Sequence, residues 1–201
     1  MRILITGFEP FGGEQINPSL EAVRRLESQI ATAEIIKLPL PVVFQKSVEQ
    51  LISAIEAEQP DAVICVGQAG GVSGITVERI AVNLMDASIA DNEGYQPEDM
   101  PVLAGGPNAY FSSLPVKKIV QRIKEGGLPA FLSNSAGTYV CNNLMYGLLH
   151  HIEQNDPAVR GGFIHVPYIP EQVLDKPGKA SMALDDIVRA IGIAVRAATE
   201  D

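Results

Sequence analysis

The stretch that decides the fold is Ala62-Val63-Ile64-Cys65-Val66, a continuous apolar run that stops at Gly67. A run of this length without polar alternation is typical of a strand that is buried on both faces, as in a parallel sheet. A second apolar run is Ile3-Leu4-Ile5, and apolar residues at helical spacing lie between the two runs, in residues 18–30 and 44–55. This alternation predicts an α/β fold, a twisted and mostly parallel sheet with helices on both faces.

The rhythm changes after Gly74 and later returns. Residues 75–84 alternate like a strand, whereas residues 86–107 are polar and rich in glycine and proline, and long irregular loops in compact domains are usually functional. The remaining pattern predicts a helix at about 115–124, a strand near Phe131, a helix at 141–153, a strand at 162–166 and a helix from Ser181. A chain of 201 residues can bury one good core, so we expect a single domain over residues 1–201.

Charge and composition limit the partners. The chain has 15 Lys and Arg against 24 Asp and Glu and contains no run of basic residues, which disfavours nucleic acid and anionic membranes as partners. The N-terminal apolar stretch is too short for a signal peptide, and no segment is long enough to span a bilayer. A lone disulfide is not expected in such a chain, so we predict a cytosolic protein with two free thiols.

Cys141 is the strongest candidate for chemistry. It follows the run Ser133-Asn134-Ser135-Ala136-Gly137-Thr138-Tyr139-Val140, in which an apolar strand passes through small residues into a predicted helix. The first turn of a helix carries unpaired N–H groups and a partial positive charge, which favour a thiolate and offer donors to an oxyanion. The alternative is a cysteine that is merely small enough to fit. Cys65, inside an apolar run, is expected to be structural.

A cysteine nucleophile needs a base, and the chain has three histidines. His150 and His151 follow Cys141 on the same predicted helix, roughly 13–15 Å along its axis, which is beyond hydrogen-bond reach. His165 ends the strand after that helix. Because the carboxyl ends of parallel strands share one edge of a sheet, we expect His165 to meet Cys141 there. The alternative is a histidine that packs at a strand end and is satisfied by a carbonyl.

Glu78 is the candidate carboxylate for orienting that histidine. It falls in phase with the apolar residues that follow it, and a carboxylate that points the same way as core residues needs a partner. The apolar residues before it have the opposite phase, which indicates a change of face at Glu78, as at a bulge. A surface pair with Arg79 is the alternative, and Asp86, Asp91 and Glu93 are alternative carboxylates in the polar loop.

Two glycine-bearing loops follow the apolar strands. Residues 6–13 have neither the lysine of a phosphate-binding loop nor the spacing of a dinucleotide-binding loop, so nucleotide binding is not expected. Two phenylalanines in this loop, Phe8 and Phe11, instead suit a small flat ligand. The second loop, residues 67–71, offers flexible backbone and the amide side chain of Gln68.

Together these segments resemble one known family, pyroglutamyl peptidase I, also called pyrrolidone carboxyl peptidase. The resemblance covers nearly the whole chain. It is carried by residues 6–13, by 67–71 followed by Val77-Glu78-Arg79-Ile80-Ala81-Val82-Asn83, by 91–94 and 105–107, by 133–142, and by Gly161-Gly162-Phe163-Ile164-His165-Val166-Pro167-Tyr168-Ile169-Pro170-Glu171-Gln172.

The resemblance implies a cysteine exopeptidase that removes an N-terminal pyroglutamyl residue from peptides by thiol acyl transfer. The implied catalytic residues are Cys141 as nucleophile, His165 as base and Glu78 as orienting carboxylate. The implied substrate-binding residues are Phe8, Phe11, Gln68, Tyr139 and Val140. A three-layer α/β/α sandwich, similar to that of phosphorylases and hydrolases, is also implied, as is a cytoplasmic homotetramer that needs no metal or cofactor.

Two positions depart from the family pattern. Ser88 stands where the family commonly has an arginine that is proposed to help near the oxyanion, and Tyr139 stands where it has phenylalanine. Tyrosine keeps a ring for stacking, whereas loss of the guanidinium removes a charged donor and bears on the rate or pH profile rather than on the reaction class. Two other functions are alternatives, a pyroglutamyl-peptide-binding protein with impaired catalysis and a phosphorylase or hydrolase on a similar sheet.

Overall fold

The computed structural model describes residues 1–200. Its elements in chain order are β1 (Arg2–Phe8), α1 (Pro18–Arg25), β2 (Gln29–Ile30), β3 (Ala33–Leu40), α2 (Lys46–Glu58), β4 (Ala62–Gln68), β5 (Ile75–Glu78), β6 (Ile80–Val82), β7 (Ala109–Phe111), α3 (Val116–Glu125), β8 (Ala130–Ser133), α4 (Val140–Asn155), β9 (Arg160–Val166), the 3₁₀ helix η1 (Pro170–Val173) and α5 (Leu184–Thr199).

The central sheet has the strand order β2-β3-β1-β4-β9-β5-β8. The strands β3, β1, β4 and β9 are parallel neighbours, whereas β2 pairs antiparallel with β3 and β5 pairs antiparallel with β9. At the far edge β8 is parallel to β5, and β6 and β7 form a separate antiparallel ribbon. The sheet is therefore mixed and mostly parallel, which confirms the predicted α/β class.

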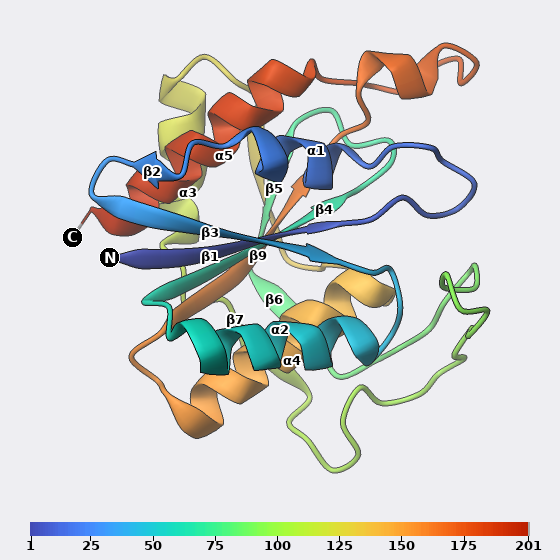
Figure 1. Ribbon diagram of the computed structural model, residues 1–201. Coiled ribbons are helices and arrows are strands. Elements are labelled where there is room, and N and C mark those ends of the chain that lie inside the picture. Colours follow the sequence, from blue (N-terminus) through green and yellow to red (C-terminus); the bar gives the residue numbers. More distant parts are fainter. Residues whose placement is uncertain (201) are drawn as a thin grey trace.

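Helices cover both faces of the sheet, with α1, α3 and α5 on one face and α2 and α4 on the other (Figure 1). Side chains of β1 divide between the two layers, since Ile3 and Ile5 pack with the first group of helices and Leu4 packs with the second. All three are fully buried. A strand between two helical layers needs apolar residues on both faces, which explains the continuous apolar runs in the sequence.

Two helices are shorter than their apolar patterns predict. α1 ends at Arg25 instead of continuing to about residue 30, because the chain turns back there into the β2–β3 hairpin. α5 begins at Leu184 instead of Ser181, because Ser181 forms a bridge with Tyr168 and belongs to an extended segment. In both cases backbone pairing of the flanking residues limits the helix, and side-chain periodicity does not report that pairing.

The predicted strand at residues 75–84 is divided in two. β5 ends at Glu78 in the central sheet, and β6 begins at Ile80 and pairs with β7, a strand that the sequence pattern did not indicate. The change of side-chain phase at Glu78 therefore marks the point where the chain leaves the sheet, and the expected bulge within one strand is wrong.

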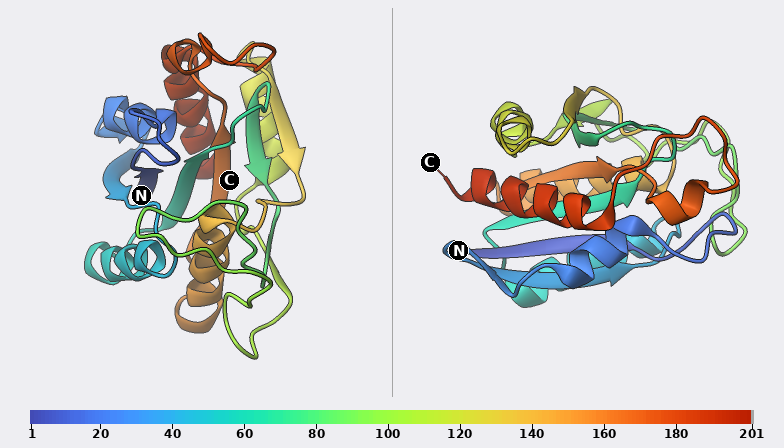
Figure 2. Two further views of the ribbon diagram at one scale, coloured as in Figure 1. Left: turned by 90° about the vertical axis from the view of Figure 1, so that its right-hand side faces the viewer. Right: turned by 90° about the horizontal axis from the view of Figure 1, so that it is seen from above.

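Long loops gather at the end of the sheet where β1, β4 and β9 terminate. The loop after β1 (blue) and the loop after β6 (green) lie there together with η1 (orange), as Figure 2 shows. Asp91 organises the green loop, because its carboxylate accepts hydrogen bonds from the N–H groups of Phe44, Glu93 and Tyr95 at 2.9–3.0 Å. Ligands of open α/β sheets bind at this edge, so these loops are where a functional site is expected.

Asn142 holds the first turn of α4 against β6. The side chain is fully buried, its Oδ1 accepts from the N–H of Val82 at 2.9 Å, and its Nδ2 donates to the carbonyls of Val82 and Leu84, each at 2.9 Å. Three hydrogen bonds with one side chain satisfy backbone groups at the end of β6, a strand with only one pairing partner, and of Leu84 just beyond it. The start of α4 is thereby fixed in position.

We expect Asn142→Ala to lower the free energy of unfolding by about 2–4 kcal/mol, because it leaves three partly buried backbone groups without partners. Urea unfolding followed by circular dichroism measures this loss. The matched control is Asn155→Ala at the exposed end of the same helix, where a change within about 0.5 kcal/mol is expected. An Asn142→Ala protein as stable as that control would show that these bonds do not anchor the helix.

Candidate active site

Cys141 lies in the first turn of α4, which begins at Val140, and its thiol faces the end of β4. A Cβ atom added to Gly67 would lie 3.0 Å from Sγ of Cys141, so the thiol rests directly on this glycine. Gly67 is in turn the register partner of His165 in the neighbouring strand β9. The structure therefore brings the predicted nucleophile and the predicted base to the same place on the sheet.

The route by which the chain reaches this place differs from the prediction. β8 is parallel to β5 and β5 is antiparallel to β9, so β8 and β9 run in opposite directions. Their carboxyl ends therefore do not share one edge, and that premise of the sequence argument is wrong. Residues 134–139 instead carry the chain from β8 to the carboxyl end of β9, where Cys141 and His165 meet.

His165 is buried between the thiol and a carboxylate. Its side chain is only 8% exposed, and its Nδ1 lies 2.9 Å from Oε1 of Glu78. Burial lowers the pKa of His165, but the negative charge of Cys141, the hydrogen bond to Cys141 and the contacts with Glu78 together outweigh burial and raise that pKa to about 9. The imidazolium form of His165 is therefore favoured beside Cys141.

Glu78 reaches His165 from β5, the antiparallel neighbour of β9. The residue is 2% exposed, and its Oε2 has no hydrogen-bond partner among residues 1–200. A carboxylate in this position makes Nδ1 the donor of the imidazole ring and leaves Nε2 available to Cys141. The three side chains thus form the continuous arrangement Cys141, His165, Glu78.

The alternative carboxylates and His150 are either engaged by other groups or exposed. Asp91 is committed to the backbone of its own loop, and Glu93 pairs with Lys46. Asp86 is exposed. Nδ1 of His150 lies 2.8 Å from the hydroxyl of Tyr110, and His150 belongs to the later part of α4, away from Cys141 in its first turn. The cysteines also differ, since burial raises the pKa of Cys65 to about 12, as expected of a structural thiol.

A small cavity of about 40 Å³ adjoins the thiol. The residues that line it are Phe8, Phe11, Asn17, Val42, Gln68, Tyr139, Val140 and Cys141. All the predicted substrate-binding residues belong to this lining, whereas Asn17 and Val42 were not indicated by the sequence pattern. Asn17 directly precedes Pro18 and caps α1, a helix-start signal that locates it at this edge of the sheet. Val42 carries no signal beyond being apolar.

Aromatic rings form one wall of the cavity. Tyr139 lies 6.1 Å from Phe11 and 5.4 Å from Phe44 between ring centroids. Its hydroxyl donates to the carbonyl of Ala90 at 3.0 Å, and burial, followed by the charges of Asp91 and Cys141, raises its pKa to about 12. The hydroxyl group is therefore a neutral donor that ties the 86–107 loop to the cavity wall, a contact that phenylalanine does not provide.

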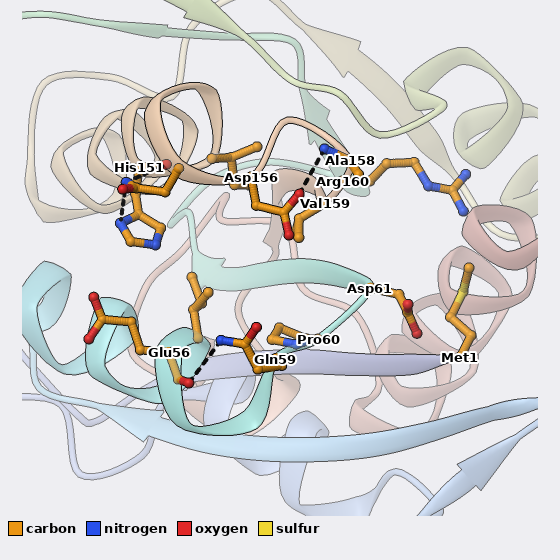
Figure 3. A pocket seen from close by; sticks show the side chains of 13 residues that line it. Met1, Glu56, Gln59, Pro60, Asp61, His151, Asp156, Ala158, Val159 and Arg160 are labelled. Carbon is orange, nitrogen blue, oxygen red and sulfur yellow. Dashed lines mark hydrogen bonds between the residues drawn. The ribbon is translucent and has the colours of Figure 1, made fainter.

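A second cleft, of about 560 Å³, lies between the carboxyl-terminal ends of α2 and α4 (Figure 3). Its lining includes His151, Asp156, Glu56 and Arg160 but neither cysteine. Although this cleft is larger, it is not the candidate site, because its lining has no cysteine paired with a histidine and a carboxylate. No three or more His, Cys, Asp and Glu side chains among residues 1–200 are placed to hold a metal ion, and no helix there has the length and apolarity needed to cross a membrane.

Gly67 has no room for a side chain. An added Cβ would lie 2.7 Å from Cζ of Phe163 and 3.0 Å from Sγ of Cys141, so one of the two must move. We expect Gly67→Ala to lower kcat/KM of any reaction at Cys141 by about a hundredfold, because displacing a reacting group, here the thiol, by roughly 1 Å has that effect. Steady-state kinetics measure it. The control is Gly192→Ala in α5, where an added Cβ would have no neighbouring atom within 4 Å. If the Gly67→Ala protein were as active as this control, the thiol would not rest on Gly67.

Comparisons with known proteins identify the family of this chain. A family model described as pyroglutamyl peptidase matches residues 1–201. The pyrrolidone-carboxylate peptidase of Clostridium botulinum is 54% identical over the whole chain and 94% of its own length, and pyrrolidone-carboxylate peptidase 1 of Streptococcus pneumoniae is 56% identical over 98% of this chain and 92% of its own length.

Solved structures give the same result. Pyroglutamyl peptidase I of Bacillus amyloliquefaciens superposes with a TM-score of 0.95 at 51% identity and covers 98% of this chain and 96% of its own. A mutant pyrrolidone carboxyl peptidase of Pyrococcus furiosus superposes with a TM-score of 0.95 at 48% identity and covers 98% of each chain. With a family model across its full length and relatives above half identity, the chain belongs to the pyroglutamyl peptidase family.

Proposed function

We propose that this protein is a cysteine exopeptidase that removes an N-terminal pyroglutamyl residue from peptides, with Cys141 as nucleophile, His165 as acid and base, and Glu78 as the group that orients His165. The observation that carries the proposal is the half-buried thiol of Cys141 beside the buried pair of His165 and Glu78, next to a small cavity with aromatic walls. Family membership supports the substrate class.

The geometry accounts for each step of an acyl transfer. Sγ of Cys141 attacks the pyroglutamyl carbonyl carbon, and N–H groups of the first turn of α4, which have no intrahelical acceptors, stabilise the oxyanion. The carbon–nitrogen bond then breaks as His165 gives its proton to the departing amine. A water molecule attacks the thioester, passes a proton to His165 and releases pyroglutamate, which restores the starting state of the enzyme.

The cavity supports selection of the lactam ring. Its aromatic and apolar side chains and its two amides, Asn17 and Gln68, suit a flat uncharged ring, and the lining contains no carboxylate that could pair with the ammonium group of an ordinary N-terminus. The volume is small, so a larger first residue does not fit. We therefore propose that specificity rests on ring shape and on the absence of charge.

The family resemblance supports further assignments of the same proposal. We assign residues 1–201 to a single peptidase domain, and the family model spans that same range. We also propose a cytosolic homotetramer, a state for which the exposed side chains of Phe111 and Leu174, 69% and 87% exposed, offer apolar contact surface. Light scattering at the working concentration tests the tetramer, and a monomer under those conditions would contradict it.

Two parallel assays and one labelling reaction test the proposed function. Hydrolysis of a pyroglutamyl arylamide is expected and hydrolysis of a prolyl arylamide is not. A small alkylating reagent is expected to modify Cys141, with loss of activity and with protection by a pyroglutamyl ligand. Ligand binding without release of amine would instead support a binding protein, for which the departure at Ser88 is the candidate cause. Activity that requires phosphate and ignores alkylation would support the phosphorylase alternative.

The raised pKa of His165 predicts the alkaline limb of the pH profile. His165 acts as the acid that protonates the departing amine, and it loses that proton as the pH rises through about 9. We therefore expect kcat/KM to be retained below this value and to fall above it with a slope of one proton. A pH profile of kcat/KM measures the limb, and a fall that is already complete near pH 7 would contradict the assigned charge state.

A further inference from the structure

Gln172 is a buried amide that does not line the cavity but contacts Gln68, which does. It belongs to η1 and is 5% exposed. Its Nε2 lies 3.0 Å from Oε1 of Gln68, 3.2 Å from the carbonyl of Ile16 and 3.2 Å from Oε2 of Glu14, and its Oε1 accepts from the N–H of Ile169 at 3.2 Å. Both polar ends of Gln172 are therefore in use.

These partners allow only one orientation of the Gln172 amide. The N–H of Ile169 can only donate, so the group facing it must be the oxygen of Gln172. The carbonyl of Ile16 and the carboxylate of Glu14 can only accept, so the group facing them must be the nitrogen. Three groups with fixed roles thus assign the two ends of the Gln172 amide, independently of Gln68.

The orientation of Gln172 determines that of Gln68. Because Gln172 presents its NH₂ group, whose two hydrogens are shared among Gln68, Ile16 and Glu14, Gln68 must meet it with an oxygen. The two N–H groups of Gln68 are left for other partners. Gln68 lines the cavity beside Cys141, and among residues 1–200 its Nε2 donates to no protein acceptor and is not fully enclosed by protein atoms. With its oxygen engaged by Gln172, Gln68 can offer the cavity hydrogen-bond donors but no acceptor.

We propose that Gln172 is a positioning residue that sets the hydrogen-bond polarity of the cavity, so that Gln68 donates to the ring carbonyl of the substrate. The inference rests on the proposed function and deepens it. A lactam presents a carbonyl oxygen that accepts this bond, whereas a pyrrolidine ring such as that of proline has only N–H donors, which would face the N–H groups of Gln68. Gln172 thus contributes to the preference for the lactam over proline without contacting the substrate.

The surrounding structure keeps Gln172 in place. Glu14 is held by Lys176 through an ion pair at 2.8 Å, and Lys176 also donates to the backbone carbonyl of Gln172. Tyr168 packs so closely on the loop after β4 that a Cβ at Gly70 would lie 2.3 Å from its hydroxyl oxygen. The η1 segment therefore joins the loop after β1, beside which it lies in Figure 2, to the end of β4 through Gln172.

The test reverses the polarity. In Gln172→Glu one oxygen still accepts from Ile169, and the ionised carboxylate, which then also faces Glu14 and the carbonyl of Ile16, can no longer donate. Gln68 is therefore expected to turn its NH₂ group toward residue 172 and its oxygen toward the cavity. We expect KM for a pyroglutamyl arylamide to rise about tenfold or more with kcat within about threefold, because a ground-state ring contact is lost. The ratio of pyroglutamyl to prolyl kcat/KM should fall by at least the same factor. The control Glu171→Gln, an exposed neighbour on η1, should change neither quantity.

Two further variants keep the outcome decisive. Gln172→Met removes the polar end and should raise KM with the same split between KM and kcat. Gln68→Glu retains an acceptor for Gln172 but places an oxygen in the cavity, and it should raise KM even if both Gln172 variants fail to fold. Wild-type hydrolysis that depends on Cys141 establishes the proposed function beforehand. Given that activity, folded variants with KM and the substrate ratio within twofold of wild type would overturn the role of Gln172 alone.

Discussion

Substituting serine for Cys141 is expected to reduce kcat/KM for a pyroglutamyl arylamide by at least about a thousandfold. The hydroxyl of serine has nearly the same shape as the thiol but is a far weaker acid, so it cannot exist as the anion that pairs with the His165 imidazolium. The first turn of α4 and the support of Gly67 remain unchanged in this variant. Steady-state hydrolysis with a fluorogenic arylamide measures the loss.

Cys65 supplies the internal control for this experiment. It lies in the fully buried strand β4, and burial raises its pKa to about 12, so it is not expected to react. Cys65→Ala should keep kcat within about threefold of wild type while losing some stability, since only a small buried group is removed. If Cys141→Ser retained a tenth of the activity, or if Cys65→Ala abolished it, the assignment of the nucleophile would be wrong.

Replacing Glu78 by glutamine is expected to lower kcat by about 10²- to 10⁴-fold. The amide NH₂ group can donate to Nδ1 of His165, which favours the tautomer that carries its proton on Nε2. In that tautomer Nε2, the nitrogen available to Cys141, cannot accept a proton. Loss of the negative charge also removes one of the groups that raise the pKa of His165. The alkaline limb of the residual activity should therefore move to lower pH than in the wild type.

Glu93→Gln is the matched control for Glu78→Gln. Glu93 is exposed and pairs with Lys46, so loss of its charge should leave both kcat and the pH profile unchanged. Thermal unfolding of the Glu78 variant separates a folding defect from a catalytic one. A folded Glu78→Gln protein with a wild-type rate and an unshifted alkaline limb would show that Glu78 does not orient His165.

The sequence predicted those parts of the fold that depend on local pattern. The apolar runs around Ile3 and Ile64 predicted the buried parallel strands, because burial on both faces of a strand leaves no polar alternation. The phase change at Glu78 predicted a carboxylate that points inward, and in the structure Glu78 lies 2.9 Å from His165. Each of these signals depends on near neighbours in the chain.

Features that depend on distant pairing were not predictable from the sequence. The direction of β8 relative to β9 is set by the position of β5 between them, and no local pattern encodes it. The β6–β7 ribbon joins segments almost thirty residues apart, and its three-residue strands are too short to show a period. The approach of Gln172 to Gln68 spans 104 residues, so its consequence for the cavity became visible only in three dimensions.

Trapping the covalent intermediate tests the central claim most directly. Rapid acid quenching of the enzyme with excess pyroglutamyl arylamide, followed by peptide mapping with mass spectrometry, shows where the acyl group resides. One pyroglutamyl group per chain is expected as a thioester on Cys141, and no adduct is expected with Cys141→Ser. Turnover without any adduct under conditions that favour its accumulation, or an adduct at Cys65 or another residue, would contradict the account.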